Sequence, residues 1–220
     1  MTRGLFVSLE GGEASGKSLQ ARTLERSLRD AGHDVVITRE PGGTPTGERV
    51  REIVLHAGEL RLHPLAQVLL FSAARAQLVR EVIDPALARG AVVITDRFYD
   101  STTVYQGHGH GVDLAGIDAV TRFAVGGTRP DRTFLLDIPV EVGLRRSAER
   151  AAGRRWDRFE TGDAGFHQRL RDGYLRLAAA EPGRFVVIDG DRPADQIAGL
   201  ISGEVLAVLA RQRAYTPGPT

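Results

Sequence analysis

The sequence predicts an α/β fold in which a mainly parallel, five-stranded sheet carries helices on both faces. Two observations support this fold class. Five short runs rich in β-branched and aliphatic residues are typical of buried strands, and segments with a helical spacing of apolar residues alternate with them along the chain. Parallel strands need such crossover segments between them, and the crossing helices cover both faces of the sheet.

The expected elements follow one another in order. The strands are residues 5–9, 35–38, 92–95, 133–136 and 185–188, and the main helices include residues 19–31, 65–87, 140–151 and 194–209. Residues 152–163 interrupt the helical pattern and are expected to form a small lid, whereas residues 214–220 are expected to be a frayed tail. We therefore predict that residues 1–220 form one domain with a lid insertion.

The composition limits the classes of function. Of the 220 residues, 42% are hydrophobic and 26% are charged, which is typical of a globular domain with one large core. The 29 basic and 28 acidic side chains give a net charge of +1, so any anion must be recognised locally. Cysteine is absent, which excludes a disulfide framework and a thiol nucleophile. No stretch approaches the roughly 20 apolar residues of a membrane span. We expect a cytoplasmic protein that binds neither nucleic acid nor membrane.

A glycine-rich motif lies between the first expected strand and the first helix. It matches G-x-x-x-x-G-K-[ST], the P-loop pattern, and comprises Gly11, Gly12, Glu13, Ala14, Ser15, Gly16, Lys17 and Ser18. The glycines let backbone N–H groups point at phosphate oxygens, Lys17 can reach the β- and γ-phosphates, and the Ser18 hydroxyl can ligate Mg²⁺. A glycine-rich turn that only caps a helix is the alternative. The motif in this context predicts a nucleoside triphosphate site.

Charged residues follow the other strands at the same edge of the sheet. Asp96 follows the third strand, where P-loop enzymes place the carboxylate that holds Mg²⁺. Its neighbour Arg97, which Arg39 and Arg51 could join, suits a second anionic ligand because arginine recognises phosphate through two parallel donors. A local ion pair is the simpler interpretation of each pair alone.

Two further segments indicate a kinase site. Phe71 and Arg75 share one helix face and together offer a flat apolar surface and a fork of donors, which suits a nucleobase, although each alone is also typical of an ordinary core or surface residue. Residues 154–162 carry five charged side chains, three of them arginines. A basic lid can exclude water and bring an arginine onto the transferring phosphoryl group, whereas a charged surface loop is the alternative.

On these motifs the chain resembles the bacterial thymidylate kinases, which phosphorylate dTMP with ATP. The resemblance spans nearly the whole chain and rests on residues 10–18, 38–44, 70–75, 96–98, 101–102, 105–107, 129–131 and 136–137. It implies a P-loop NTPase-type fold like that of nucleoside monophosphate kinases, ATP and Mg²⁺ as cofactors, dTMP as acceptor, and a homodimer.

The resemblance also implies residue roles. Around dTMP, Phe71 would stack on thymine with Arg75, Thr102 and Gln106 as polar base contacts, Tyr105 would occupy the place of a ribose 2′-hydroxyl, Arg51 and Arg97 would hold the phosphate, and Glu40 would order the acceptor. The implied catalytic residues are Lys17, Arg158, Asp96 and Glu13, and the implied metal ligands are Ser18 and Asp96. ATP would bind residues 11–18.

The chain departs from the family pattern at two points. Leu19 stands where the family usually has a second hydroxyl residue beside the α-phosphate, and the lid carries Arg154 and Arg155 beside Arg158, the residue that matches the family's lid arginine. Two other functions remain open from the residues alone. One is a kinase of another nucleotide or nucleoside, and the other is a P-loop nucleotide-binding switch.

Overall fold

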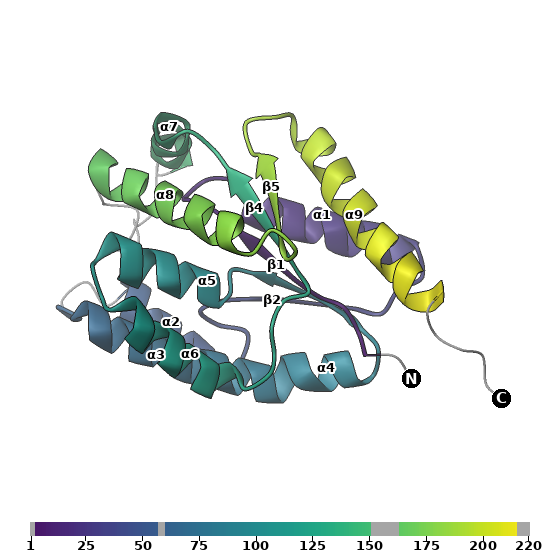
Figure 1. The fold of residues 1–220 in the computed structure, drawn as a ribbon, viewed down its shortest axis with the longest axis horizontal. Coiled ribbons are helices and arrows are strands. Elements are labelled where there is room, and N and C mark those ends of the chain that lie inside the picture. The colour runs from purple at the N-terminus through teal and green to yellow at the C-terminus, as the bar shows by residue number, and fades with distance from the viewer. Residues whose placement is uncertain (1–2, 57–59, 151–162, 215–220) are drawn as a thin grey trace.

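The computed structural model describes residues 3–56, 60–150 and 163–214, and within them it confirms the predicted fold class (Figure 1). The strands are β1 (Phe6–Glu10), β2 (Val35–Arg39), β3 (Val92–Asp96), β4 (Arg132–Asp137) and β5 (Phe185–Asp189). All four strand pairings are parallel, and the order across the sheet is β2-β3-β1-β4-β5. Because the connections leave β1 toward one side and later return to its other side, the carboxyl end of β1 is where a ligand crevice is expected.

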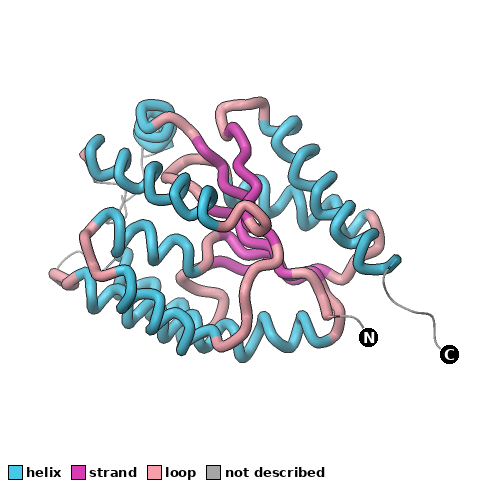
Figure 2. The backbone as a smooth tube through the Cα atoms, in the orientation of Figure 1, coloured by secondary structure: helices cyan, strands magenta, loops and turns pink. Residues whose placement is uncertain are grey.

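Helices cover both faces of this sheet (Figure 2). The helical elements are α1 (Lys17–Asp30), α2 (Pro45–Arg51), η1 (Glu52–His56), α3 (Pro64–Leu78), η2 (Val79–Ile83), α4 (Asp84–Ala88), α5 (Tyr99–Thr102), η3 (Thr103–Gly109), α6 (Leu114–Val125), α7 (Val140–Arg150), α8 (Ala164–Ala180) and α9 (Ala194–Ala214), where η marks a π-helical turn. Helices α1 and α9 lie on one face, and α3, α4, α6 and α8 lie on the other (Figure 1). None of the helices described is long and apolar enough to cross a membrane.

The two faces of β1 bury different kinds of side chain. Leu5, Val7 and Leu9 pack in the core under α1 and α9, whereas Phe6 packs in the core of the opposite face. Since side chains alternate along a strand, Ser8 and Glu10 share the face of Phe6. Both are fully buried, so this face carries polar groups into the interior directly below the P-loop.

The helix expected at residues 65–87 is divided in the structure. Helix α3 ends at Leu78, η2 follows with wider hydrogen bonding, and α4 begins at Asp84. Pro85 has no N–H group to donate to the carbonyl four residues earlier, which accounts for the break in the regular ladder. Of the predicted lid only Asp163 is described, where it caps α8, and of the predicted tail only Ala214, the last residue of α9. The rest of both segments lies outside the described residues.

Candidate functional site

The P-loop connects the end of β1 to the start of α1 through two glycines with positive φ angles. Gly11 has a φ of +143°, and a Cβ added there would lie 2.6 Å from the carbonyl oxygen of Leu136. Gly16, the N-cap of α1, has a φ of +97°. Only glycine adopts such angles without strain, so these two residues let the backbone turn sharply into the helix N-terminus.

Lys17 folds back over this loop. Its Nζ donates to the carbonyl oxygens of Gly11 at 3.1 Å and Gly12 at 2.7 Å, and to Ser15 Oγ at 3.2 Å. Burial and, after it, the nearby Arg97 guanidinium lower the pKa of Lys17 to about 8, although acidic neighbours including Glu13 act in the opposite direction. The ammonium is thus placed at the loop and titrates close to neutral pH.

Ser18 and Asp96 come together at the mouth of the loop. Ser18 lies in the first turn of α1 and donates from its Oγ to Oδ2 of Asp96, the last residue of β3. Hydroxyl and carboxylate oxygens suit a hard cation. Among the described residues there is no cluster of three or more acidic, histidine or cysteine side chains that could hold a metal ion by itself. An ion here would need phosphate and water as further ligands, which is the usual coordination of Mg²⁺.

A cavity of about 580 Å³ extends from the P-loop toward α3 and η3. It brings together the following predicted site residues: Glu13, Ala14, Ser15, Gly16, Lys17, Ser18, Glu40, Arg51, Phe71, Arg75, Asp96, Arg97, Thr102, Tyr105 and Gln106. Gly11 and Gly12 do not line it. The carbonyl oxygen of Gly11 instead accepts hydrogen bonds from Lys17 and Arg97. One cavity therefore joins the predicted triphosphate site to the predicted base site.

Arg97 is held at the centre of the cavity wall. Its Nη2 donates to Glu13 Oε1 at 2.7 Å and to the Tyr105 hydroxyl at 3.1 Å, and its guanidinium lies 5.0 Å from the Tyr105 ring centre. Tyr105 in turn donates to the same Glu13 oxygen at 2.5 Å. Burial opposes ionisation of Glu13, but Arg97, Lys17 and the Tyr105 hydrogen bond outweigh it and lower the pKa of Glu13 to about 2. The P-loop therefore carries a permanent negative charge at neutral pH.

At the far end of the cavity, Arg75 forms a buried ion pair with Glu40. Arg75 Nε donates to Glu40 Oε2 at 2.7 Å and Nη2 donates to Thr102 Oγ1 at 2.9 Å, and both charged residues are under 10% exposed. Burial raises the pKa of Glu40, an effect that Arg75 opposes. Among the residues that the structure describes, three buried atoms at this end find no hydrogen-bond partner: Nη1 of Arg75, Oε1 of Glu40 and Oε1 of Gln106. Since buried polar groups are normally paired, they are available to a polar ligand.

Two further predicted residues, Phe71 and Arg51, also line the cavity. Phe71 is half-buried, and its ring packs against the core cluster beneath α8 while it lines the cavity. Arg51, the last residue of α2, lines the cavity near the P-loop and donates to the Pro41 carbonyl oxygen at 2.9 Å. Arg158, the predicted lid residue, lies outside the described residues, as do Arg154 and Arg155.

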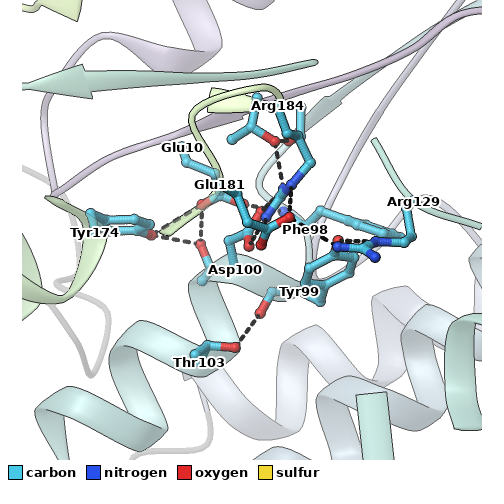
Figure 3. A network of polar contacts seen from close by, with 12 residues as sticks. Glu10, Phe98, Tyr99, Asp100, Thr103, Arg129, Tyr174, Glu181 and Arg184 are labelled. Carbon is cyan, nitrogen blue, oxygen red and sulfur yellow. Dashed lines mark hydrogen bonds and ion pairs between the residues drawn. The ribbon is translucent and has the colours of Figure 1, made fainter. Parts of the chain in front are cut away.

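The sequence alone did not identify a polar network behind Arg97 (Figure 3). Glu10 and Tyr174 meet there, and a neighbouring ion pair joins Asp100 to Arg184 through two hydrogen bonds of 2.6 and 2.9 Å. The period-2 alternation of β1 could have indicated a buried Glu10. Tyr174 and Arg184 carry no such sequence signal, because they reach the network from α8 and from the loop before β5.

Comparison with known proteins gives one consistent family. Residues 9–201 match the family model described as thymidylate kinase. A thymidylate kinase of Deinococcus radiodurans is 50% identical over 197 residues, covering 90% of this chain and 94% of that protein. One from Trichlorobacter lovleyi is 47% identical over 209 residues, covering 94% of this chain and 99% of that protein. A solved structure of thymidylate kinase from Ehrlichia chaffeensis matches with a TM-score of 0.72 at 32% identity, covering 94% of this chain and 99% of that one.

Proposed function

This chain belongs to the thymidylate kinase family, and on that premise we propose that its cavity binds Mg²⁺-associated ATP at the P-loop and dTMP beside Phe71 and Arg75. It is a nucleoside monophosphate kinase, and the reaction converts ATP and dTMP into ADP and dTDP. One observation carries the assignment of the two ends. One cavity joins the P-loop to buried polar atoms that have no hydrogen-bond partner in the described parts of the chain, so it offers both a donor site and an acceptor site.

At the donor end, the P-loop backbone and Lys17 bind the triphosphate. Lys17 exchanges its present contacts with the loop carbonyls for the β- and γ-phosphate oxygens. Ser18 and Asp96 would hold Mg²⁺, which neutralises phosphate charge when bound. Leu19 lines the same mouth and supplies no hydroxyl, so the α-phosphate has one side-chain donor fewer than is usual in the family.

At the acceptor end, the base stacks on Phe71 while Arg75 and Gln106 supply hydrogen bonds to its edge. The unpartnered Nη1 of Arg75 is a donor, and the amide of Gln106, whose Nε2 already donates to Gln67, offers its oxygen. From the family resemblance, Tyr105, which lines the cavity, would occupy the place of a ribose 2′-hydroxyl and so favour a deoxynucleotide. Arg51 and Arg97 bind the dTMP phosphate, and Glu40 fixes Arg75 in place.

Little proton transfer is needed for the chemistry. The acceptor is a phosphate monoester with a second pKa of about 6, so its oxygen is largely ionised at neutral pH. Catalysis then depends on holding the two phosphates in line and on neutralising the charge of the transferring group. Lys17 and Arg97 supply positive charge from the described site, and Arg158 would add a further cation from the lid.

The affinity of the free protein for ATP should fall as the pH rises through about 8. Burial lowers the pKa of Lys17 to about 8, and the triphosphate binds the protonated ammonium more tightly than the neutral amine. Calorimetric titration with ATP between about pH 7 and pH 9.5 should show a Kd that rises by at most about tenfold per pH unit. Lys17→Arg keeps its charge over this range, so its profile should be flatter; identical profiles would contradict the prediction.

The acceptor assignment is tested by incubating the protein with ATP and Mg²⁺ and a panel of nucleosides and nucleoside monophosphates while ADP is measured. Turnover should be confined mainly to dTMP. Preference for a different acceptor would favour another nucleotide or nucleoside kinase. Slow ADP release without any acceptor dependence would favour a nucleotide-binding switch. The unpartnered polar atoms of Arg75, Glu40 and Gln106 disfavour that interpretation, because they suit a second ligand.

We also propose, from the family resemblance, that two copies of the chain form a homodimer and that the enzyme acts in the cytoplasm on these small molecules alone. The acceptor site described above is built from one copy of the chain.

A further inference from the structure

Glu10 is a buried carboxylate close to the site, yet it does not line the cavity. It is 0% exposed and ends β1, immediately before the P-loop. Its Oε1 accepts the backbone N–H of Phe98 at 2.7 Å, and its Oε2 accepts Ser101 Oγ at 2.7 Å and the Tyr174 hydroxyl at 3.1 Å (Figure 3). Glu10 accepts three hydrogen bonds and does not line the cavity, so it can influence a bound nucleotide only through its neighbours.

Both hydroxyls that donate to Glu10 also contact Arg97. Arg97 Nη1 donates to Ser101 Oγ at 3.1 Å and to the Tyr174 hydroxyl at 3.2 Å, and the two hydroxyls lie 2.9 Å apart. On the other side of the guanidinium, Nη2 contacts Glu13 and Tyr105 at the cavity wall. The Nη1 side of Arg97 is thus linked to Glu10, and the Nη2 side contacts two residues that line the cavity.

The direction of these hydrogen bonds depends on Glu10. A hydroxyl has one proton to donate, and an ionised carboxylate can only accept. Whether Tyr174 donates to Glu10 directly or through Ser101, the protons point toward the carboxylate. The oxygen lone pairs are then left facing Arg97, which has only donors to offer.

We propose that Glu10 is a positioning residue for Arg97: its carboxylate orients the Ser101 and Tyr174 hydroxyls as acceptors, and these fix the guanidinium for the acceptor phosphate. The inference rests on the proposed role of Arg97 toward dTMP. A protonated glutamate or a glutamine at position 10 would donate a hydrogen bond to one of the two hydroxyls instead of accepting one from it. That hydroxyl could then turn its proton toward Arg97, where two donors would oppose each other.

The surroundings of Glu10 are costly for a carboxylate. Burial and then the neighbouring Asp100 on α5 raise the pKa of Glu10 to about 7, against the opposing effects of Arg97, Ser101 and the Phe98 amide. Tyr174 on α8 and Lys17 on α1 are the other titratable groups that interact with it. Because the folded pKa lies above the unfolded value near 4.5, Glu10 ionisation lowers stability as the pH rises through about 7. A purely structural role would not require a carboxylate here.

The test is the near-isosteric Glu10→Gln enzyme, compared with wild type at pH 8. We expect the KM for dTMP to rise on the order of tenfold while the KM for ATP changes by less than about twofold. Ser8→Ala is the matched control, since it removes a buried hydrogen bond to Thr133 from the same face of β1 without touching Arg97. Equal changes in both KM values, or the same dTMP effect in the control, would overturn the inference.

The ratio of the two enzymes' KM values for dTMP provides a second readout. Neutral glutamine resembles protonated Glu10, so the ratio should be largest at pH 8 and approach one near pH 6, while the titration of dTMP itself is the same for both enzymes and cancels from it. A ratio that does not change with pH would overturn the inference.

Two further measurements test the proposal: the unfolding temperature of Glu10→Gln and the dTMP KM of Tyr174→Phe. At pH 8 Glu10→Gln should unfold at the same or a higher temperature than wild type, because it removes a buried charge. Should Glu10→Gln fail to fold, Tyr174→Phe removes one of the two hydroxyls and should raise the dTMP KM selectively; an unchanged KM would overturn the proposal. Failure of wild type to phosphorylate dTMP would instead refute the proposed function.

Discussion

Replacing Arg158 with alanine is expected to lower turnover on the order of 10³-fold, the scale known for arginine fingers, with little change in dTMP affinity. The residue matches the family's lid arginine by sequence and lies outside the described part of the chain. The measurement is steady-state kinetics with both substrates varied, together with dTMP binding by calorimetry. A loss confined to turnover identifies a contact made mainly in the transition state.

The reason for so large an effect lies in the charges of the described site. The P-loop contributes Lys17, but it also contributes Glu13, whose pKa of about 2 keeps it ionised at every working pH. Glu13 forms an ion pair with Arg97 at 2.7 Å, so part of that cation's charge is already neutralised. The charge on a transferring phosphoryl group therefore calls for a further cation, which we assign to the lid.

The lid offers matched controls for Arg158. Arg154 and Arg155 have the same side chain in the same segment, so Arg154→Ala and Arg155→Ala change the net charge equally. We expect these variants to retain most of the turnover. Near-normal turnover in Arg158→Ala, or an equal loss in Arg154→Ala, would remove Arg158 from this role.

The sequence predicted the sheet and the P-loop well because both depend on local patterns. Each strand is a short apolar run, and the observed bounds differ from the expected ones by at most one residue at either end. The P-loop has glycine at Gly11 and Gly16, where φ lies far from the range that other residues favour, and this preference is visible in the residue type itself. Most predicted cavity residues likewise follow strands or share one helix face.

The supporting network could not be predicted in this way, because its members come from distant parts of the chain. Tyr174 contacts Glu10 across 164 residues of sequence, and Arg184 reaches Asp100 across 84. Neither contact belongs to a periodic pattern, and a buried tyrosine on α8 looks in sequence like any core residue. Only the packing of α8 against η3 and the sheet places its hydroxyl beside Arg97.

The second large effect is expected for Arg75→Met, which should reduce both stability and dTMP binding. Breaking a buried ion pair by removing one partner typically costs about 3–5 kcal/mol, because the other charge is left unpaired. Here the remaining charge is Glu40, which is 7% exposed and accepts from Arg75 at 2.7 Å. The free energy of unfolding can be measured in urea, and the dTMP KM under conditions where the variant is folded.

The double variant Arg75→Met/Glu40→Gln separates the two effects. Removing the unpaired carboxylate should restore most of the lost stability, since a neutral amide costs less to bury than a charge. It should not restore dTMP binding, because the Nη1 donor proposed to meet the base is still missing. If the double variant is as unstable as Arg75→Met, the packing of the arginine side chain matters more than its charge.

The pH dependence of Arg75→Met gives an independent check on the same physical cause. Burial already raises the pKa of Glu40 in the intact protein, and loss of Arg75 removes the cation that opposes this shift. A group with a raised folded pKa contributes stability that is present at low pH and is lost as the pH rises. The destabilisation by Arg75→Met should therefore shrink as the pH falls and Glu40 takes up a proton. In the double variant, which has no carboxylate at position 40, this dependence should disappear, and its persistence there would assign the effect to another group.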